Sequence, residues 1–119
     1  LSFDGVPAEL KLVLESSVKQ CDTPYLRYLL NVDVSKSLDK VKCPVLALNG
    51  TKDTQVDCAS NIQVLESGLI NSRHEIKKFE GLNHLFQHCT TGSVLEYQQI
   101  EETIAPEVLQ AIIGWLKTL

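Results

Sequence analysis

A continuous apolar segment, CPVLALNG at residues 43–50, constrains the fold more than any other feature of this chain. It has the length of a strand, apolar and polar residues do not alternate along it, and it ends in an Asn-Gly pair. Strands without alternation are typical of parallel sheets, in which helices cover both faces. The segment therefore predicts an α/β protein in which this strand is buried on both faces.

The residues after this strand continue the α/β pattern. Residues 58–70 carry apolar side chains at helical spacing, residues 73–80 have the pattern of a shorter strand, and residues 106–119 predict a closing amphipathic helix. A long irregular stretch, residues 81–104, separates the last two. The order strand, helix, strand, helix predicts two parallel strands joined by a right-handed crossover. Because parallel sheets normally have several strands, we expect this pair to be the end of a larger sheet.

The first forty residues have a different, helical character. Residues 7–19 begin with Pro7 and carry apolar residues at helical spacing, which predicts a helix. Thr23-Pro24 has the pattern of an N-cap and first helical residue, which predicts a second helix. A further turn is expected at residues 35–41. We therefore divide the chain into a helical segment at residues 1–40 and an α/β portion at residues 41–119.

Composition limits the classes of partner. The net charge of the 119-residue chain is −4 and no cluster of Lys and Arg occurs, which argues against nucleic acid. No apolar run approaches the ~20 residues of a membrane helix, so no membrane partner is expected. His84, His88 and Cys89 are close in sequence, but no second pair of ligands accompanies them, and no metal is expected. The chain has no Met, which suggests a segment of a longer protein.

Two polar residues follow the two predicted strands. Asp53 lies on the NGTKD loop after the first strand, and His84 lies on the GLNH loop after the second. Functional groups gather at the carboxyl ends of parallel strands, so both side chains should rise at one edge of the sheet. There a carboxylate can accept a hydrogen bond from one imidazole nitrogen and leave the other nitrogen free as a general base.

These segments resemble a known family, the α/β-hydrolases. CPVLALNGTKDTQV is similar to the segment that carries the acid of the catalytic triad, and FEGLNHLF is similar to the segment that carries its histidine. The order Asp53 before His84 agrees with the order of the triad in that fold. The resemblance extends from Val41 to Leu119 and is closest to esterases and serine aminopeptidase-like members. It implies that residues 1–40 are lid-like helices and that Asp53 and His84 are catalytic.

The resemblance also implies a serine nucleophile, which this chain lacks. No G-x-S-x-G motif occurs, and neither Ser67 nor Ser93 lies in a similar context. We therefore expect a C-terminal fragment of a serine hydrolase that acts on a small ester or amide through an acyl-serine, without a cofactor, and we expect the isolated fragment to be inactive. The family usually has Pro where this chain has Asp57, so Asp57 is either a helix N-cap or a competing acid.

One further expectation follows from the incomplete sheet. The open edge of the first strand should make the chain a homo-oligomer. The alternative function is a non-catalytic binding module with an α/β-hydrolase-like pocket. The compartment stays open, with a slight preference for the cytoplasm.

Overall fold

The described part of the chain, residues 5–119 of a computed structural model, divides into two units after Asp33. Residues 1–4, which the sequence analysis placed in the lid-like segment, lie outside the described residues. The second unit begins at Val34 and runs to Leu119. Each unit is described by itself below.

The first unit contains two helices, as the sequence predicts. Helix α1 spans Ala8–Cys21 and helix α2 spans Pro24–Asn31. The Thr23 hydroxyl accepts a hydrogen bond from the Leu26 amide at 3.2 Å, which confirms the predicted N-cap. Neither helix has a buried residue, so no hydrophobic core forms within this unit.

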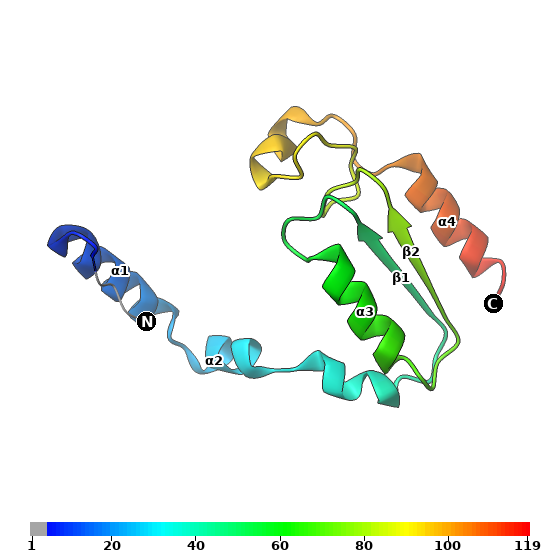
Figure 1. Ribbon diagram of the computed structural model, residues 1–119, viewed down its shortest axis with the longest axis horizontal. Helices are drawn as coiled ribbons and strands as arrows, with labels where there is room; N and C mark the ends of the chain where they lie inside the picture. The colour runs from blue at the N-terminus through cyan, green and yellow to red at the C-terminus, as the bar shows by residue number, and fades with distance from the viewer. Residues whose placement is uncertain (1–4) are drawn as a thin grey trace. The chain divides into compact units, whose positions relative to one another are not determined.

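The second unit contains the α/β portion. Strand β1 spans Val45–Gly50, helix α3 spans Cys58–Gly68, strand β2 spans His74–Phe79 and helix α4 spans Pro106–Leu116. The two strands pair in parallel, from Val45 opposite His74 to Gly50 opposite Phe79 (Figure 1). The structure is therefore a mixed α/β arrangement with the predicted βαβα order. None of the helices in residues 5–119 is long and apolar enough to cross a membrane.

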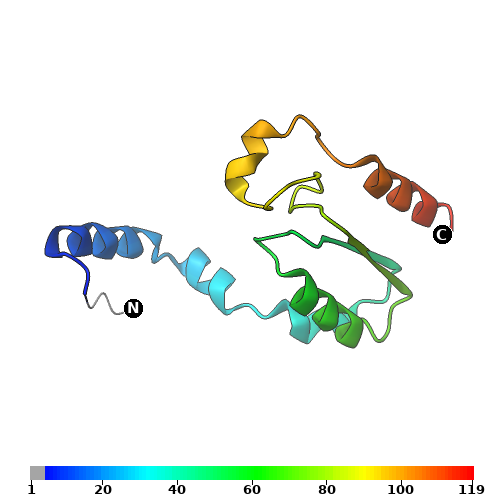
Figure 2. The same cartoon turned by 45° about the horizontal axis from the view of Figure 1, so that its top comes forward.

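Helices α3 and α4 cover opposite faces of the sheet (Figures 1 and 2). Leu48 and Phe79 share one face, where they pack beside Val108 of α4. The next residue of β1, Asn49, points to the other face and accepts a hydrogen bond from Asn61 of α3. The prediction that β1 is buried on both faces is wrong in part. Residues 45–48 are only half-buried, because a two-stranded sheet leaves its edges open.

Two 3₁₀ helices complete the second unit. Helix η1 spans Val34–Lys40, near the expected turn, and packs against α3. Helix η2 spans Val94–Gln99, within the stretch predicted to be irregular. The sequence did not predict η2 because a helix this short has no apolar periodicity to detect.

Candidate active site

The carboxyl ends of β1 and β2 lie at the same edge of the sheet, and Asp53 and His84 follow them (Figure 1). His84 Nδ1 lies 2.9 Å from Asp53 Oδ2. The structure thus brings together the two residues that the sequence singled out. Thirty-one positions separate them in the chain, and the parallel register of the strands closes that separation.

Close backbone packing joins the loops that carry these residues. A Cβ at Gly50 would lie 2.3 Å from the Leu82 carbonyl oxygen, so only glycine allows this approach. The Lys52 amide donates to the Leu82 carbonyl at 2.9 Å, and the Gly81 amide donates to Thr51 Oγ1 at 2.9 Å. Because backbone groups form most of these links, the distance between the loops depends little on side-chain rotamers.

The Asp53 carboxylate is almost fully surrounded by donors. Oδ1 accepts hydrogen bonds from the Gln55 and Val56 amides, both at 2.9 Å, and Oδ2 accepts from His84. The side chain is only 6% exposed. Burial by itself raises the pKa of Asp53, but the hydrogen bonds from Val56, His84 and Gln55 outweigh burial and leave this pKa below its usual value. Asp53 is therefore an anion at neutral pH.

The Asp53 anion determines the tautomer of neutral His84. A carboxylate can only accept hydrogen bonds, so the proton of the imidazole lies on Nδ1. Within residues 5–119, Nε2 has no hydrogen-bond partner, and the side chain is 38% exposed. Nε2 therefore presents a free lone pair, which is what a general base requires.

The other candidate acid and the other histidines have structural partners. Asp57 is the N-cap of α3 and accepts from the Ser60 amide at 2.9 Å, so it does not compete with Asp53. His88 bridges two carboxylates, with Nδ1 3.0 Å from Glu102 and Nε2 3.1 Å from Glu107. His74 Nδ1 lies 3.0 Å from the Ser72 carbonyl oxygen. Of the three histidines, only His84 pairs with a buried carboxylate.

No nucleophile contacts His84 within the described part of the chain. The Ser67 hydroxyl donates to the Val64 carbonyl, and the Ser93 hydroxyl caps η2. Cys58 is buried, and burial raises the pKa of its thiol, which disfavours the reactive thiolate. Among residues 5–119, no three His, Cys, Asp or Glu side chains form a group that could hold a metal ion.

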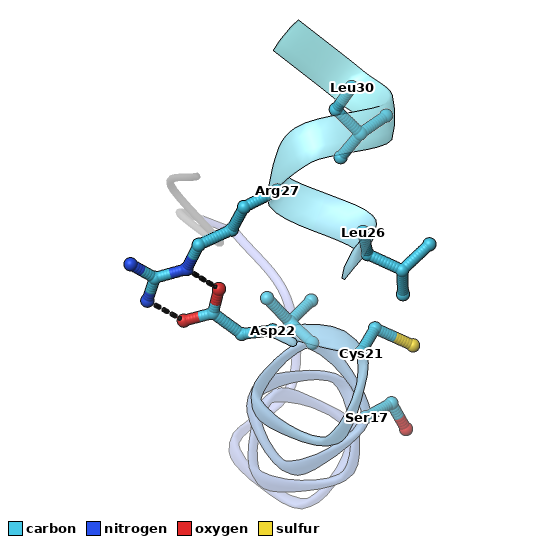
Figure 3. Close-up of a pocket in the computed structure, with 7 residues that line it drawn as sticks. Ser17, Cys21, Asp22, Leu26, Arg27 and Leu30 are labelled. Atoms are coloured by element: carbon cyan, nitrogen blue, oxygen red, sulfur yellow. Dashed lines mark hydrogen bonds and ion pairs between the residues drawn. The ribbon is translucent and has the colours of Figure 1, made fainter. Parts of the chain in front are cut away.

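Two surface hollows lie elsewhere in the molecule, and neither includes Asp53 or His84. One, of about 320 Å³, lies between α1 and α2 in the first unit and has apolar walls, with an Asp22–Arg27 ion pair at its rim (Figure 3). The other, of about 390 Å³, is polar and adjoins η2; it is lined by His88, Cys89, Thr90, Glu96, Gln99 and Ile100. The Glu96 carboxylate is already engaged by the amides of Thr90 and Gly92, so this hollow offers no free carboxylate.

Three buried amide side chains near Asp53 and His84 escaped the sequence analysis. They are Asn49, Asn83 and Gln87. In the sequence Asn49 is part of the Asn-Gly pair that ends an apolar run, Asn83 is part of the GLNH segment, and Gln87 lies in an irregular stretch. A polar residue that directly ends an apolar strand, as Asn49 does, is the signal that could have identified one of them.

Comparisons with known proteins add no relative to this picture. No family model, curated protein or solved structure matches the chain. The assignment of function therefore depends on the geometry of the site.

Proposed function

We propose that this chain is the C-terminal part of a serine hydrolase of the α/β-hydrolase fold, of the esterase or serine aminopeptidase-like type. One observation carries the proposal. The buried Asp53 carboxylate holds His84 Nδ1 at 2.9 Å, at the carboxyl edge of a parallel sheet, while Nε2 has no partner within residues 5–119. This arrangement suits an acid–histidine pair that activates a hydroxyl nucleophile.

In the proposed reaction, His84 Nε2 takes the proton from a serine hydroxyl as the serine oxygen attacks the carbonyl carbon of an ester or small amide. The protonated imidazole then returns that proton to the leaving alcohol or amine, and an acyl-serine remains. The same nitrogen then deprotonates a water molecule, which attacks the acyl carbon. The bond to the serine oxygen breaks, the imidazolium returns the proton to that oxygen, and the carboxylic acid leaves. Asp53 stays ionised throughout and stabilises the imidazolium that forms in each half of the reaction.

The proposal requires a serine from outside these 119 residues, because no G-x-S-x-G motif occurs in them. The donors that stabilise the oxyanion would come from the same missing segment. We therefore expect the isolated chain to have no hydrolase activity, since removing the serine eliminates most of the acceleration that a triad provides.

The test is labelling with a fluorophosphonate, which reacts with activated serines. The probe would be applied to the isolated chain, to the longer protein that contains it, and to Asp53→Asn and His84→Ala variants of the longer protein. His74→Ala is a matched control, because His74 lies at the opposite end of β2. We expect label on the longer protein and on the control, and little or none on the isolated chain or on the other two variants.

Two other results would count against the proposal. Label on the isolated chain would mean that one of its own serines is the nucleophile. If the longer protein does not react either, the non-catalytic binding module becomes the better interpretation.

A further inference from the structure

Three buried polar residues of the described chain lie beside Asp53 or in the turn that carries His84. Among residues 5–119, the buried polar residues are Asn49, Asn83 and Gln87, which are 4%, 0% and 7% exposed. A buried amide destabilises a protein by about 1–3 kcal/mol unless its hydrogen bonds are replaced. In the described residues every buried side-chain nitrogen and oxygen has a partner. These partners lie at the end of β1 or in the loop after it that carries Asp53 (the acid loop, residues 51–57), in the loop after β2 that carries His84 (the histidine loop, residues 80–88), on α3, or at Glu102 before α4.

Asn83 and Gln87 connect the histidine loop to the segment before α4. Asn83 Oδ1 accepts from the Leu85 and Gln87 amides at 2.9 and 3.0 Å. Asn83 Nδ2 then donates to Gln87 Oε1 at 3.0 Å, and Gln87 Nε2 donates to the Glu102 carbonyl at 2.7 Å. Backbone amides can only donate and backbone carbonyls can only accept. The two ends of this series therefore determine the orientation of both side-chain amides.

This series holds a strained backbone next to His84. Phe86 has a φ of 58°, in the left-handed region that non-glycine residues rarely adopt. Its amide donates to the Asn83 carbonyl at 3.0 Å, and its carbonyl accepts from the Ala105 amide at 2.8 Å. Such a conformation costs about 1–3 kcal/mol and persists only where the surroundings enforce it. Asn83 and Gln87 are part of those surroundings, and His84 lies in the turn between them.

Asn49 contacts the acid loop as Asn83 and Gln87 contact the histidine loop. Its Nδ2 faces the Gly50 carbonyl at 3.3 Å and Asp53 Oδ2 at 3.5 Å, which are both acceptors. Its Oδ1 accepts from Asn61 Nδ2 at 2.8 Å. Asn61 lies on α3, so Asn49 links the Asp53 carboxylate to the helix that covers one face of the sheet. At 3.5 Å the contact from Asn49 to Asp53 is long for a hydrogen bond and contributes little free energy. Its role is to orient the Asp53 carboxylate.

We infer that Asn83 and Gln87 are positioning residues for His84, and that Asn49 has the same role for Asp53. This inference rests on the proposed function, because positioning matters only if His84 acts as a base. The buried amides hold the imidazole where Nδ1 meets Asp53 and Nε2 stays exposed. A misplacement of about 1 Å in such a pair lowers kcat on the order of 100-fold.

The test measures the tautomer of His84 by ¹⁵N NMR of its ring nitrogens in the full 119-residue chain, across pH. Two variants are compared. Asn83→Ala removes the acceptor that forms the turn. Gln87→Met removes the hydrogen bonds of the Gln87 side chain to Asn83 Nδ2 and to the Glu102 carbonyl, and it keeps the turn, which uses only the Gln87 backbone amide. Asn71→Ala is the matched control, because Asn71 is an exposed asparagine whose amide also donates to a carbonyl, that of Asp39, at 2.7 Å.

We expect His84 to carry its proton on Nδ1 in the unmodified chain and in the control. In both test variants we expect the Nδ1–H signal to weaken in favour of Nε2–H. In the longer protein, kcat should fall on the order of 100-fold while KM changes little. If Asn83→Ala does not fold, Gln87→Met alone decides the outcome.

Failure of the inference and failure of the proposed function give different results. A folded Gln87→Met variant with an unchanged His84 tautomer would overturn the positioning role and leave the proposed function intact. If His84 in the unmodified chain is not protonated on Nδ1, the acid–histidine pair itself is wrong, and the proposed function fails with it. If the longer protein does not react with the fluorophosphonate but the variants still shift the tautomer, the geometry holds without the hydrolase.

Discussion

At the scale of single residues, Asp53 shows how a buried carboxylate can stay ionised. Burial opposes the charge, and hydrogen bonds from two backbone amides and His84 more than compensate for it. The same groups that stabilise the charge also fix its direction, since Oδ1 is taken by the backbone and Oδ2 is left for His84. Charge and orientation thus have a common cause in the loop after β1, whose Gln55 and Val56 amides hold Oδ1.

The lowered pKa of Asp53 predicts a loss of stability in acid. An aspartate whose pKa is lower in the folded state contributes stability that is fully present above its unfolded pKa, about 3.9. That contribution disappears as the pH falls through the folded value. Asp53→Asn should therefore destabilise the chain at pH 7 by about 1.5–3 kcal/mol, the range for hydrogen bonds to a charged group, and the difference should narrow near pH 3.

Urea unfolding of both proteins at several pH values measures this difference. A gap between the unfolding free energies that stays constant from pH 7 to pH 3 would contradict the assignment of the lowered pKa to Asp53. Because Asp57, Glu96 and Glu102 also have lowered pKa values, the unmodified chain and the Asp53→Asn variant should both lose stability in acid. Only the difference between them reports on Asp53.

At the scale of elements, the two helices that cover the sheet each contain a glycine, in different surroundings. Gly114 of α4 has no atom within 4 Å of the position where a Cβ would lie. At Gly68, the last residue of α3, a Cβ would lie 2.7 Å from Leu38 Cβ of η1. Gly68 thus permits the close packing of η1 on α3, and Gly114 has no such role.

This contrast predicts opposite effects of the same substitution. Gly114→Ala should stabilise the chain by roughly 0.5–1 kcal/mol, because alanine favours the helix and meets no neighbour. Gly68→Ala should destabilise it, because the new methyl group displaces Leu38 and with it η1. Thermal unfolding of the two variants beside the unmodified chain tests both. A gain in stability from Gly68→Ala would show that α3 and η1 do not pack as described.

At the scale of the whole molecule, the described chain has more apolar surface than its small core can bury. Residues 34–119 bury only six apolar side chains, and α4 leaves Leu109, Ile113 and Leu116 about half exposed. Helices α1 and α2 bury none. Exposed apolar surface of this kind favours association with another apolar surface, such as that of a second copy.

The open edge of β1 predicts self-association. The amides of Val45 and Thr51 donate to the carbonyls of Arg73 and Phe79, on the side of β1 that faces β2. The alternation of a parallel ladder therefore directs the amides and carbonyls of Leu46 and Leu48 to the opposite edge. We expect the isolated chain to form a dimer or a larger oligomer through this edge. Leu46→Pro removes an outward amide without breaking a bond to β2, so it should favour the monomer. Leu46→Ala keeps that amide and serves as the control.

Light scattering over a wide range of concentration measures the oligomeric state of the three proteins. A monomeric unmodified chain at every concentration would contradict the prediction. If Leu46→Pro and Leu46→Ala dissociate to the same extent, the association depends on the leucine side chain and not on the strand edge.

The absence of a core in the first unit predicts fast hydrogen exchange there. Amides of α1 and α2 should exchange at rates near those of an unfolded peptide, since helices of this length are marginal without tertiary packing. Amides of β1 and β2 that bond across the sheet should be protected. Hydrogen–deuterium exchange of the isolated chain distinguishes the two regions. Strong protection of α1 would indicate that another surface covers it.

The local sequence determined most of the elements and the identity of the two central residues. Apolar periodicity placed α1, α3 and α4, the unbroken run at residues 43–50 placed β1, and Thr23 was recognisable as a cap. These signals are local, because a helix stripe, a strand or a cap is complete within a few residues. The proximity of Asp53 and His84 followed from one topological rule about parallel strands.

Tertiary structure alone decided how that pair is held. No local pattern distinguishes Asn49, Asn83 and Gln87 from ordinary turn residues, because their role depends on donors and acceptors far away in the chain. The choice between Asp53 and Asp57 was also made in space, since both follow the same strand and only Asp53 reaches the imidazole. Burial of β1 was overestimated for the same reason. A sequence shows that a strand is apolar, but only packing shows how much of it the neighbouring elements cover.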